Sequence, residues 1–65
     1  MRIDLNGAPI STRAATLAAL LEERGFDAAS VATALDGRFV PRSARAATAL
    51  RDGAKVEVLS PMQGG

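Results

Sequence analysis

Two segments of this sequence alternate between apolar and polar residues on both sides of a dipeptide that favours a tight turn. The first dipeptide is Asn6-Gly7 and the second is Asp36-Gly37. Asn, Asp and Gly tolerate the positive φ angles of a two-residue type I′ turn, so both pairs indicate β-hairpins. The flanking patterns predict strands over residues 1–5 and 8–13, and over residues 31–35 and 38–40.

Between the two hairpins the apolar period lengthens to that of a helix. The leucines of one helical face are Leu17, Leu20 and Leu21. Thr16 is the expected N-cap, with Thr12 as the alternative, and Gly25 is expected to end the helix in a left-handed conformation. A helix of about nine residues is unstable alone in water, so its leucine face must pack on a sheet.

The rest of the chain predicts one more strand. Residues 55–59 alternate again after a turn at Asp52-Gly53, which directs Val56 and Val58 inward. The alanine-rich segment 42–50 could hold a turn of helix. We expect Leu50 to anchor it in the core.

The element order is strand, strand, helix, strand, strand, strand. One amphipathic helix can cover only one face of a sheet, so the order indicates an α+β fold. We therefore expect a mixed sheet of four to five strands with the helix on one face. Residues 1–60 would form this domain, and residues 61–65 a flexible C-terminal tail.

The side chains that most often carry catalysis are missing. The 65 residues include no Cys and no His, which excludes thiol chemistry and the commonest general base and metal ligand. The adjacent carboxylates of Glu22 and Glu23 would not face one another on a helix. We therefore expect no enzyme activity, no metal site and no bound cofactor.

The charges are nearly balanced, at eight basic and seven acidic residues. A nucleic-acid partner is not expected, because such proteins usually carry a basic stripe. We interpret the locally basic stretch as solvated surface charge; an acidic patch on a partner, or nucleotide phosphates held by one, is the alternative. Its members are Arg38, Arg42, Arg45 and Arg51. No apolar run is long enough for a membrane span and the first residues do not read as a signal peptide, so we expect a cytoplasmic location.

The last six residues contain no apolar run that could add a core layer. They end in Gly64-Gly65, and we expect the terminal carboxylate to be the reactive group. Glycine leaves its carbonyl unhindered, and two glycines can thread a narrow channel. Extended, the five residues after Ser60 reach roughly 16 Å at about 3.3 Å each. A terminal Gly-Gly is a weak signal alone, and an inert chain end is the alternative.

Five short motifs spread over nearly the whole chain strengthen this interpretation. They are residues 3–7 (IDLNG), 16–21 (TLAALL), 34–43 (ALDGRFVPRS), 50–58 (LRDGAKVEV) and 62–65 (MQGG). With these motifs at these spacings, the chain resembles the ThiS family of sulfur carriers in thiamin biosynthesis. That family has the ubiquitin-like β-grasp fold.

The resemblance implies a carrier that reacts in the active sites of other proteins. An ATP-consuming adenylyltransferase similar to ThiF would adenylate the Gly65 carboxylate. Sulfur from a donor such as a cysteine desulfurase would displace AMP and leave a thiocarboxylate. A thiazole synthase similar to ThiG would take that sulfur into the thiazole ring. Gly64, Gln63 and Met62 would thread into these partners.

Apolar residues without a clear place in the core are candidates for docking. Leu59 falls on the strand face opposite Val56 and Val58, and Phe39 also lacks an obvious core role, as does Met62 in the tail. Such residues near a functional tail often mark an interaction patch. Arg42 is the basic residue assigned to the same patch. Alternatively, Leu59 lies beneath a loop and Phe39 completes a small core.

Other functions share parts of this pattern. The nearest is the small subunit of molybdopterin synthase, or another sulfur carrier of the same fold. A ubiquitin-like tag joined to lysines of other proteins is a second. A β-grasp binding module with an inert tail is a third.

Overall fold

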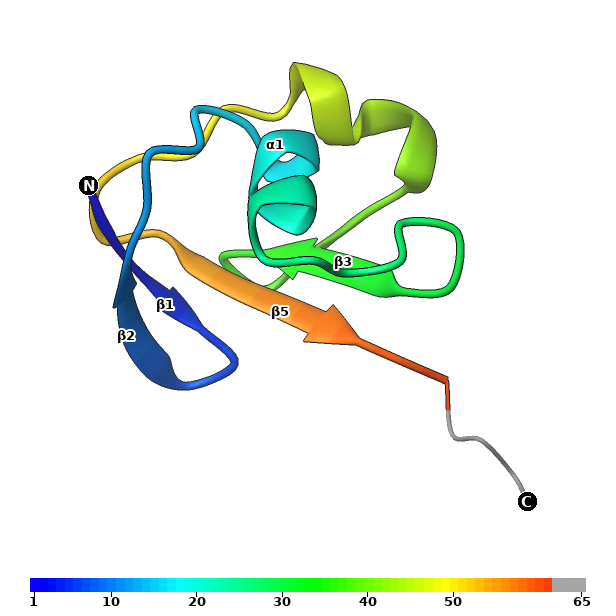
Figure 1. Cartoon of the computed structure of the whole chain (residues 1–65), viewed down its shortest axis with the longest axis horizontal. Helices are drawn as coiled ribbons and strands as arrows, with labels where there is room; N and C mark the ends of the chain where they lie inside the picture. Colours follow the sequence, from blue (N-terminus) through cyan, green and yellow to red (C-terminus); the bar gives the residue numbers. More distant parts are fainter. Residues whose placement is uncertain (62–65) are drawn as a thin grey trace.

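A computed structural model describes residues 1–61 of the chain as five strands, one α-helix and one 3₁₀ helix. The elements are β1 (Arg2–Leu5), β2 (Ala8–Ser11), α1 (Leu17–Glu23), β3 (Ala32–Leu35), β4 (Arg38–Val40), η1 (Arg42–Ala47) and β5 (Lys55–Leu59). The strands form one sheet in the order β2-β1-β5-β3-β4 (Figure 1). The β1–β5 pair is parallel and the other pairs are antiparallel, so the predicted mixed sheet is confirmed with five strands.

The two hairpins turn where the sequence predicted. Asn6 and Gly7 have φ angles of 52° and 84°, and Asp36 and Gly37 have φ angles of 50° and 83°. At the third turn only Gly53 has a positive φ, and the Ala54 amide donates to the Arg51 carbonyl at 3.0 Å. A positive φ at the third position of a hydrogen-bonded turn is typical of type II, which differs from the hairpin turns.

The helix α1 begins at the predicted cap. The Thr16 hydroxyl accepts from the Ala19 amide at 3.1 Å, and Gly25 follows the helix with a φ of 76°. Thr12, the alternative cap, is instead buried before the helix. The helix has seven residues, fewer than the expected nine, and no helix in residues 1–61 is long and apolar enough to cross a bilayer.

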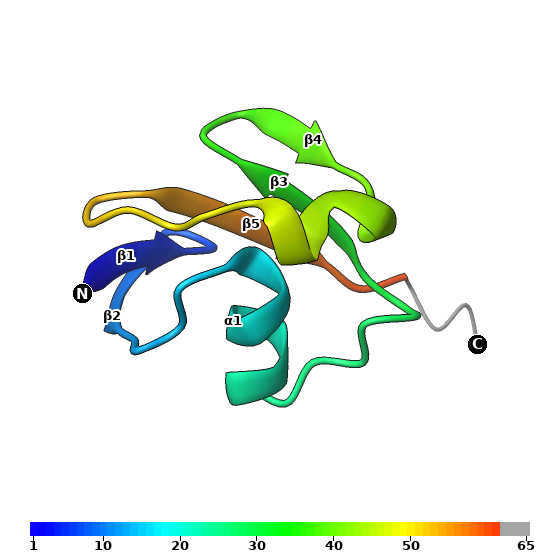
Figure 2. The same ribbon diagram turned by 90° about the horizontal axis from the view of Figure 1, so that it is seen from above.

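Both helices cover the same face of the sheet, and the core lies between (Figure 2). Leu17 and Leu20 are fully buried and Leu21 is nearly so, which at about 1.5–3 kcal/mol per buried leucine makes α1 a main source of stability. Val56 and Val58 meet them from β5, as predicted. The other face of the sheet carries neither helix.

The first strand and the alanine-rich segment follow the predictions in part. Ile3 of β1 is buried, whereas Met1, which falls on the same side of the alternating pattern, is 44% exposed. The alanine-rich segment does hold helical structure, in the 3₁₀ form. Leu50 is buried as predicted, and its amide donates to the Ala15 carbonyl at 2.9 Å. This bond ties the segment after η1 to the residues that lead into α1.

Candidate functional site at the end of the central strand

The C-terminal segment leaves the domain from the middle of the sheet. β5 lies between β1 and β3 and ends at Leu59, and Ser60 and Pro61 continue from it as exposed residues (Figure 1). The predicted reactive group and threading residues lie outside the described residues; they are Gly65, Gly64, Gln63 and Met62. The structure therefore defines the point from which that segment starts.

The end of β5 is held on both edges. On one side Ala32 of β3 pairs with Leu59. On the other side β1 has already ended, and the Asn6 side chain replaces it. Its Oδ1 accepts from the Val58 amide at 2.8 Å, and its Nδ2 donates to the Val58 carbonyl at 3.2 Å. Asn6 thus serves both the turn and the ladder, so β5 stays fixed close to its last residue.

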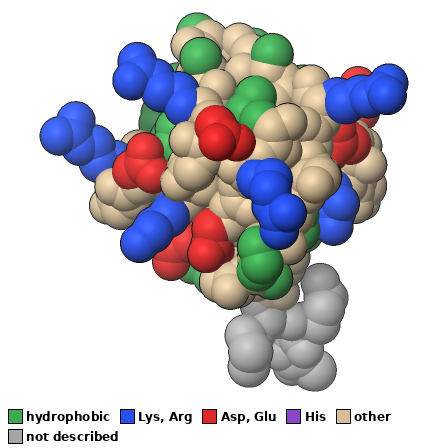
Figure 3. Space-filling model, turned by 90° about the vertical axis from the view of Figure 1, so that its left-hand side faces the viewer, with side chains coloured by type: hydrophobic (Ala, Val, Ile, Leu, Met, Phe, Trp, Pro, Cys, Tyr) green, Lys and Arg blue, Asp and Glu red, His purple; other side chains and the backbone are tan. Residues whose placement is uncertain are grey.

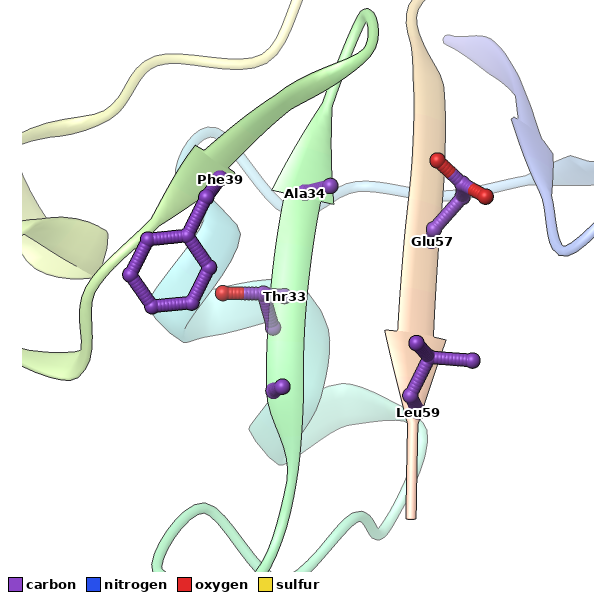
Figure 4. A pocket seen from close by; sticks show the side chains of 6 residues that line it. Thr33, Ala34, Phe39, Glu57 and Leu59 are labelled. Carbon is purple, nitrogen blue, oxygen red and sulfur yellow. The ribbon is translucent and has the colours of Figure 1, made fainter.

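The sheet face without helices carries two of the predicted docking residues, Phe39 and Leu59. Phe39 is 70% exposed and Leu59 is 66% exposed. This excludes the alternatives that Phe39 completes the core or that Leu59 lies beneath a loop. Figure 4 shows both side chains on this face, one on each side of β3. A hollow between them is lined by Ala32, Thr33, Ala34, Phe39, Glu57 and Leu59. Thr33 is buried and its side chain points to the core, so we call the other five residues of this set the open-face patch.

A second hollow lies beside the start of the C-terminal segment. Its walls are the connection from α1 to β3 on one side and the end of β5 on the other. The lining residues are Ala29, Ser30, Val31, Ala32, Leu59, Ser60 and Pro61. We call this hollow the exit groove. It adjoins the open-face patch, because Ala32 and Leu59 line both.

One wall of the exit groove is ordered by Asp27. Its carboxylate accepts from the Ser30 hydroxyl at 2.7 Å and from the Ala29 amide at 3.1 Å. The Ser30 bond lowers the pKa of Asp27 most, with further contributions from the Ala29 amide and the charge of Arg42. Arg42, the basic residue predicted to bind partners, is exposed at the start of η1. It lies close to this wall, because its charge contributes to the lowered pKa of Asp27.

The interpretation of the four clustered arginines as solvated charges is wrong for Arg45. Only 4% of Arg45 is exposed, and its guanidinium donates to acceptors around the start of β3. Composition could not reveal this. The available signal was Thr33, a polar residue at an inward strand position. A buried hydroxyl needs hydrogen-bond partners, and those of Thr33 are the Val40 carbonyl, to which it donates, and Arg45, from which it accepts.

Residues 1–61 contain no group of three or more acidic, His or Cys side chains that could hold a metal ion. Figure 3 shows one face of the molecule, on which basic and acidic side chains are interspersed. The two carboxylates with lowered pKa values, Glu23 and Asp27, are both exposed; Glu23 accepts from Thr12 and Arg13 before the helix, and Asp27 accepts from Ala29 and Ser30 in the turn that follows it. These groups stabilise the fold and form no reactive pair.

The sheet order, the single α-helix on one face and the central C-terminal strand define a ubiquitin-like β-grasp protein. Solved structures agree with this class. A crystal structure of the thiamine biosynthesis protein ThiS from Geobacter metallireducens has 33% identity and a TM-score of 0.85, with both chains fully covered. An NMR solution structure of a thiamine biosynthesis protein from the same organism gives 33% identity and a TM-score of 0.83, covering all of this chain and 88% of the other.

A comparison with protein-family models identifies the family within this fold class. The model of the ThiS family matches residues 3–65. The chain therefore belongs to the ThiS family, as the motifs indicated. A search of curated proteins finds no match.

Proposed function

We propose that this chain is a sulfur carrier of thiamin biosynthesis and that Gly65 carries the sulfur on its terminal carboxyl group. Membership of the ThiS family supports the carrier role, and the match extends to residue 65. That match is the observation on which the proposal rests. The domain of residues 1–60 serves as the body that partners recognise, and residues 61–65 serve as the segment that enters their active sites.

The chemistry takes place at one carbonyl carbon. A carboxylate oxygen of Gly65 attacks the α-phosphorus of ATP in a ThiF-like adenylyltransferase, which releases pyrophosphate and forms an acyl adenylate. A persulfide of a donor such as a cysteine desulfurase then attacks the carbonyl carbon and AMP leaves, which gives an acyl disulfide. A thiol reductant cleaves its S–S bond by two-electron reduction, whereas free hydrosulfide displaces AMP directly and needs no reductant. A terminal thiocarboxylate results. A ThiG-like thiazole synthase accepts that sulfur. ATP is consumed by the activating partner, and the carrier binds no cofactor of its own.

The open-face patch is the proposed docking surface for these partners. Phe39 and Leu59 are large apolar side chains that solvent reaches over most of their surface, and such groups are often interaction sites when they lie together. The patch adjoins the exit groove, so a partner bound there has its active site near the start of the C-terminal segment. Arg42 adds a positive charge beside the groove wall.

Intact-mass spectrometry tests the proposal. The purified chain is incubated with ATP, a ThiF-like enzyme and a sulfide source, and control mixtures omit one component at a time. We expect the mass gain of one sulfur replacing one oxygen, localised to the C-terminal peptide, only in the complete mixture. An unchanged mass under all conditions would contradict the proposal. Chain-to-lysine conjugates of high mass would instead favour a protein tag.

A further inference from the structure

The guanidinium of Arg45 joins three parts of the chain below the exit groove. Its Nη1 donates to the Ala28 carbonyl at 2.8 Å, and its Nη2 donates to the Val31 carbonyl at 2.7 Å. Its Nε donates to the Thr33 hydroxyl at 3.0 Å. That hydroxyl in turn donates to the Val40 carbonyl at 2.7 Å. One side chain from η1 therefore holds the α1–β3 connection, β3 and, through Thr33, β4.

All three acceptors of this buried cation are neutral. Burial of a charge is costly, and hydrogen bonds to carbonyls recover only part of that cost. An apolar side chain could fill a comparable space without the cost of desolvation. What the guanidinium adds is geometry, because its planar fork fixes several acceptors at defined positions. The two carbonyls that it fixes lie three residues apart in one connection.

That connection forms a wall of the exit groove. Ala29, Ser30 and Val31 line the groove opposite Ser60 and Pro61. Arg45 holds the wall from inside through Ala28 and Val31. The Asp27 carboxylate holds it from the solvent side through Ala29 and Ser30. The wall is thus bonded on both sides, next to the residues where the C-terminal segment begins.

We propose that Arg45 is a positioning residue for the reaction at Gly65. By fixing the wall formed by residues 28–31, it fixes the groove along which the chain leaves β5, and so the direction in which the C-terminal segment enters a partner. The expected effect on the reaction at Gly65 rests on the proposed function. The coupling between Arg45 and the exit groove is a property of the free protein and can be tested without any partner.

The first test uses NMR spectroscopy of the free protein. The Arg45→Lys variant keeps the positive charge but replaces the fork with a single ammonium, which cannot reach all three acceptors. We expect changed carbonyl shifts at Ala28 and Val31, and changed amide shifts at Leu59 and Ser60 across the groove. The hairpin at residues 5–8 should be unaffected. The matched control is Arg51→Lys, which makes the same change at an exposed arginine.

The second test compares kcat with KM for the adenylyltransferase, with the carrier as the varied substrate. A misdirected segment reacts poorly once bound, so Arg45→Lys should lower kcat roughly tenfold while KM stays within about twofold. Phe39→Ser should raise KM and leave kcat nearly unchanged, because it weakens docking and leaves the groove intact. This split separates positioning from docking, and general loss of structure would not produce it.

Several outcomes would overturn the inference. One is a folded Arg45→Lys variant with an unchanged kcat; another is a raised KM at constant kcat. A third is a set of shift changes confined to residues 28–31 that does not reach Leu59 and Ser60. If Arg45→Lys does not fold, Thr33→Val removes the two bonds of the Thr33 hydroxyl, from Arg45 and to Val40, but leaves the bonds to Ala28 and Val31, so it should give smaller changes in the same direction. If the wild-type chain forms no thiocarboxylate, the proposed function fails, while the NMR comparison still decides the coupling.

Discussion

At the scale of single residues, Glu23 joins the end of α1 to the segment that precedes the helix. Its carboxylate accepts from the Thr12 hydroxyl at 2.6 Å and from the Arg13 amide at 3.1 Å. The Thr12 bond is the main reason that the pKa of Glu23 lies below its ordinary value of 4.5, and the Arg13 amide and the charge of Arg24 lower it further. The folded state therefore favours the ionised carboxylate.

A lowered pKa in the folded state gives stability that is present above the ordinary value and lost as the pH falls through the lowered one. We therefore expect Glu23→Gln to lower the Tm at neutral pH. The Tm of the wild type should stay above that of the variant from neutral pH down to about pH 4.5 and fall toward it as the pH drops further. Circular dichroism melts across this range provide the measurement.

Glu22→Gln is the matched control, since it makes the same substitution at the preceding, exposed position. The Tm of Glu22→Gln should show the same dependence on pH as the Tm of the wild type. A constant gap between wild type and Glu23→Gln from neutral to acidic pH would mean that the Thr12 bond does not depend on ionisation, contrary to this account.

Single residues also show where sequence reasoning succeeds. The alternation in β5 placed Leu59 on the outer face correctly, because period two leaves no choice once Val56 and Val58 are buried. The residues of η1 show no such alternation, so the sequence pattern could not predict that Arg45 is buried and Arg42 is exposed. Its burial depends on acceptors in a connection far away in the sequence, at Ala28 and Val31.

At the scale of elements, both hairpin turns contribute a side chain to β5. Asn6 of the first turn makes two hydrogen bonds with the backbone of Val58, and Asp36 of the second accepts one from the Lys55 amide at 2.9 Å. The central strand is thereby fixed near both of its ends. Asn-Gly and Asp-Gly predicted the turns, whereas the bonds to β5 depend on a strand order that local sequence does not encode.

The Asn6→Gly variant tests this role, because glycine keeps the positive φ of the turn and removes only the side chain. Two lost hydrogen bonds should destabilise the protein by about 1–3 kcal/mol, measured by urea unfolding. Asp36→Gly is the control, with one lost bond and a smaller expected cost. Equal stability of Asn6→Gly and wild type, or a larger cost for Asp36→Gly, would refute the role of Asn6.

The extent of each element was harder to predict than its type. β2 ends at Ser11 although its pattern ran to residue 13; the next residue, Thr12, is buried, and its hydroxyl donates to the Glu23 carboxylate at the end of α1. The N-cap at Thr16 was predicted correctly, since capping depends on neighbours three residues away. Only the final residues, which carry the proposed chemistry, lie outside what the structure describes.

At the scale of the whole molecule, the proposed function assigns separate tasks to the body and to the C-terminal segment. Every buried apolar residue of the core cluster in residues 1–61 lies between Ile3 and Val58. The sheet, both helices and the Arg45 cluster are likewise complete before Ser60. Stability should therefore depend on the body, and the proposed sulfur chemistry on Gly65.

Deleting Gly64 and Gly65 tests this division, because it should remove the chemistry and spare the fold. Thiocarboxylate formation should be abolished in the intact-mass assay. The Tm should change by less than about 4 °C, since a loss of 1 kcal/mol shifts the Tm of a domain of this size by about 4–8 °C. Leu20→Ala is the opposite control: it removes a fully buried side chain, so it should cost about 2–5 kcal/mol while leaving the reactive end unchanged. A truncated chain that melts far below the wild type would show that the last residues belong to the fold, and the carrier would then have to unfold part of itself to react.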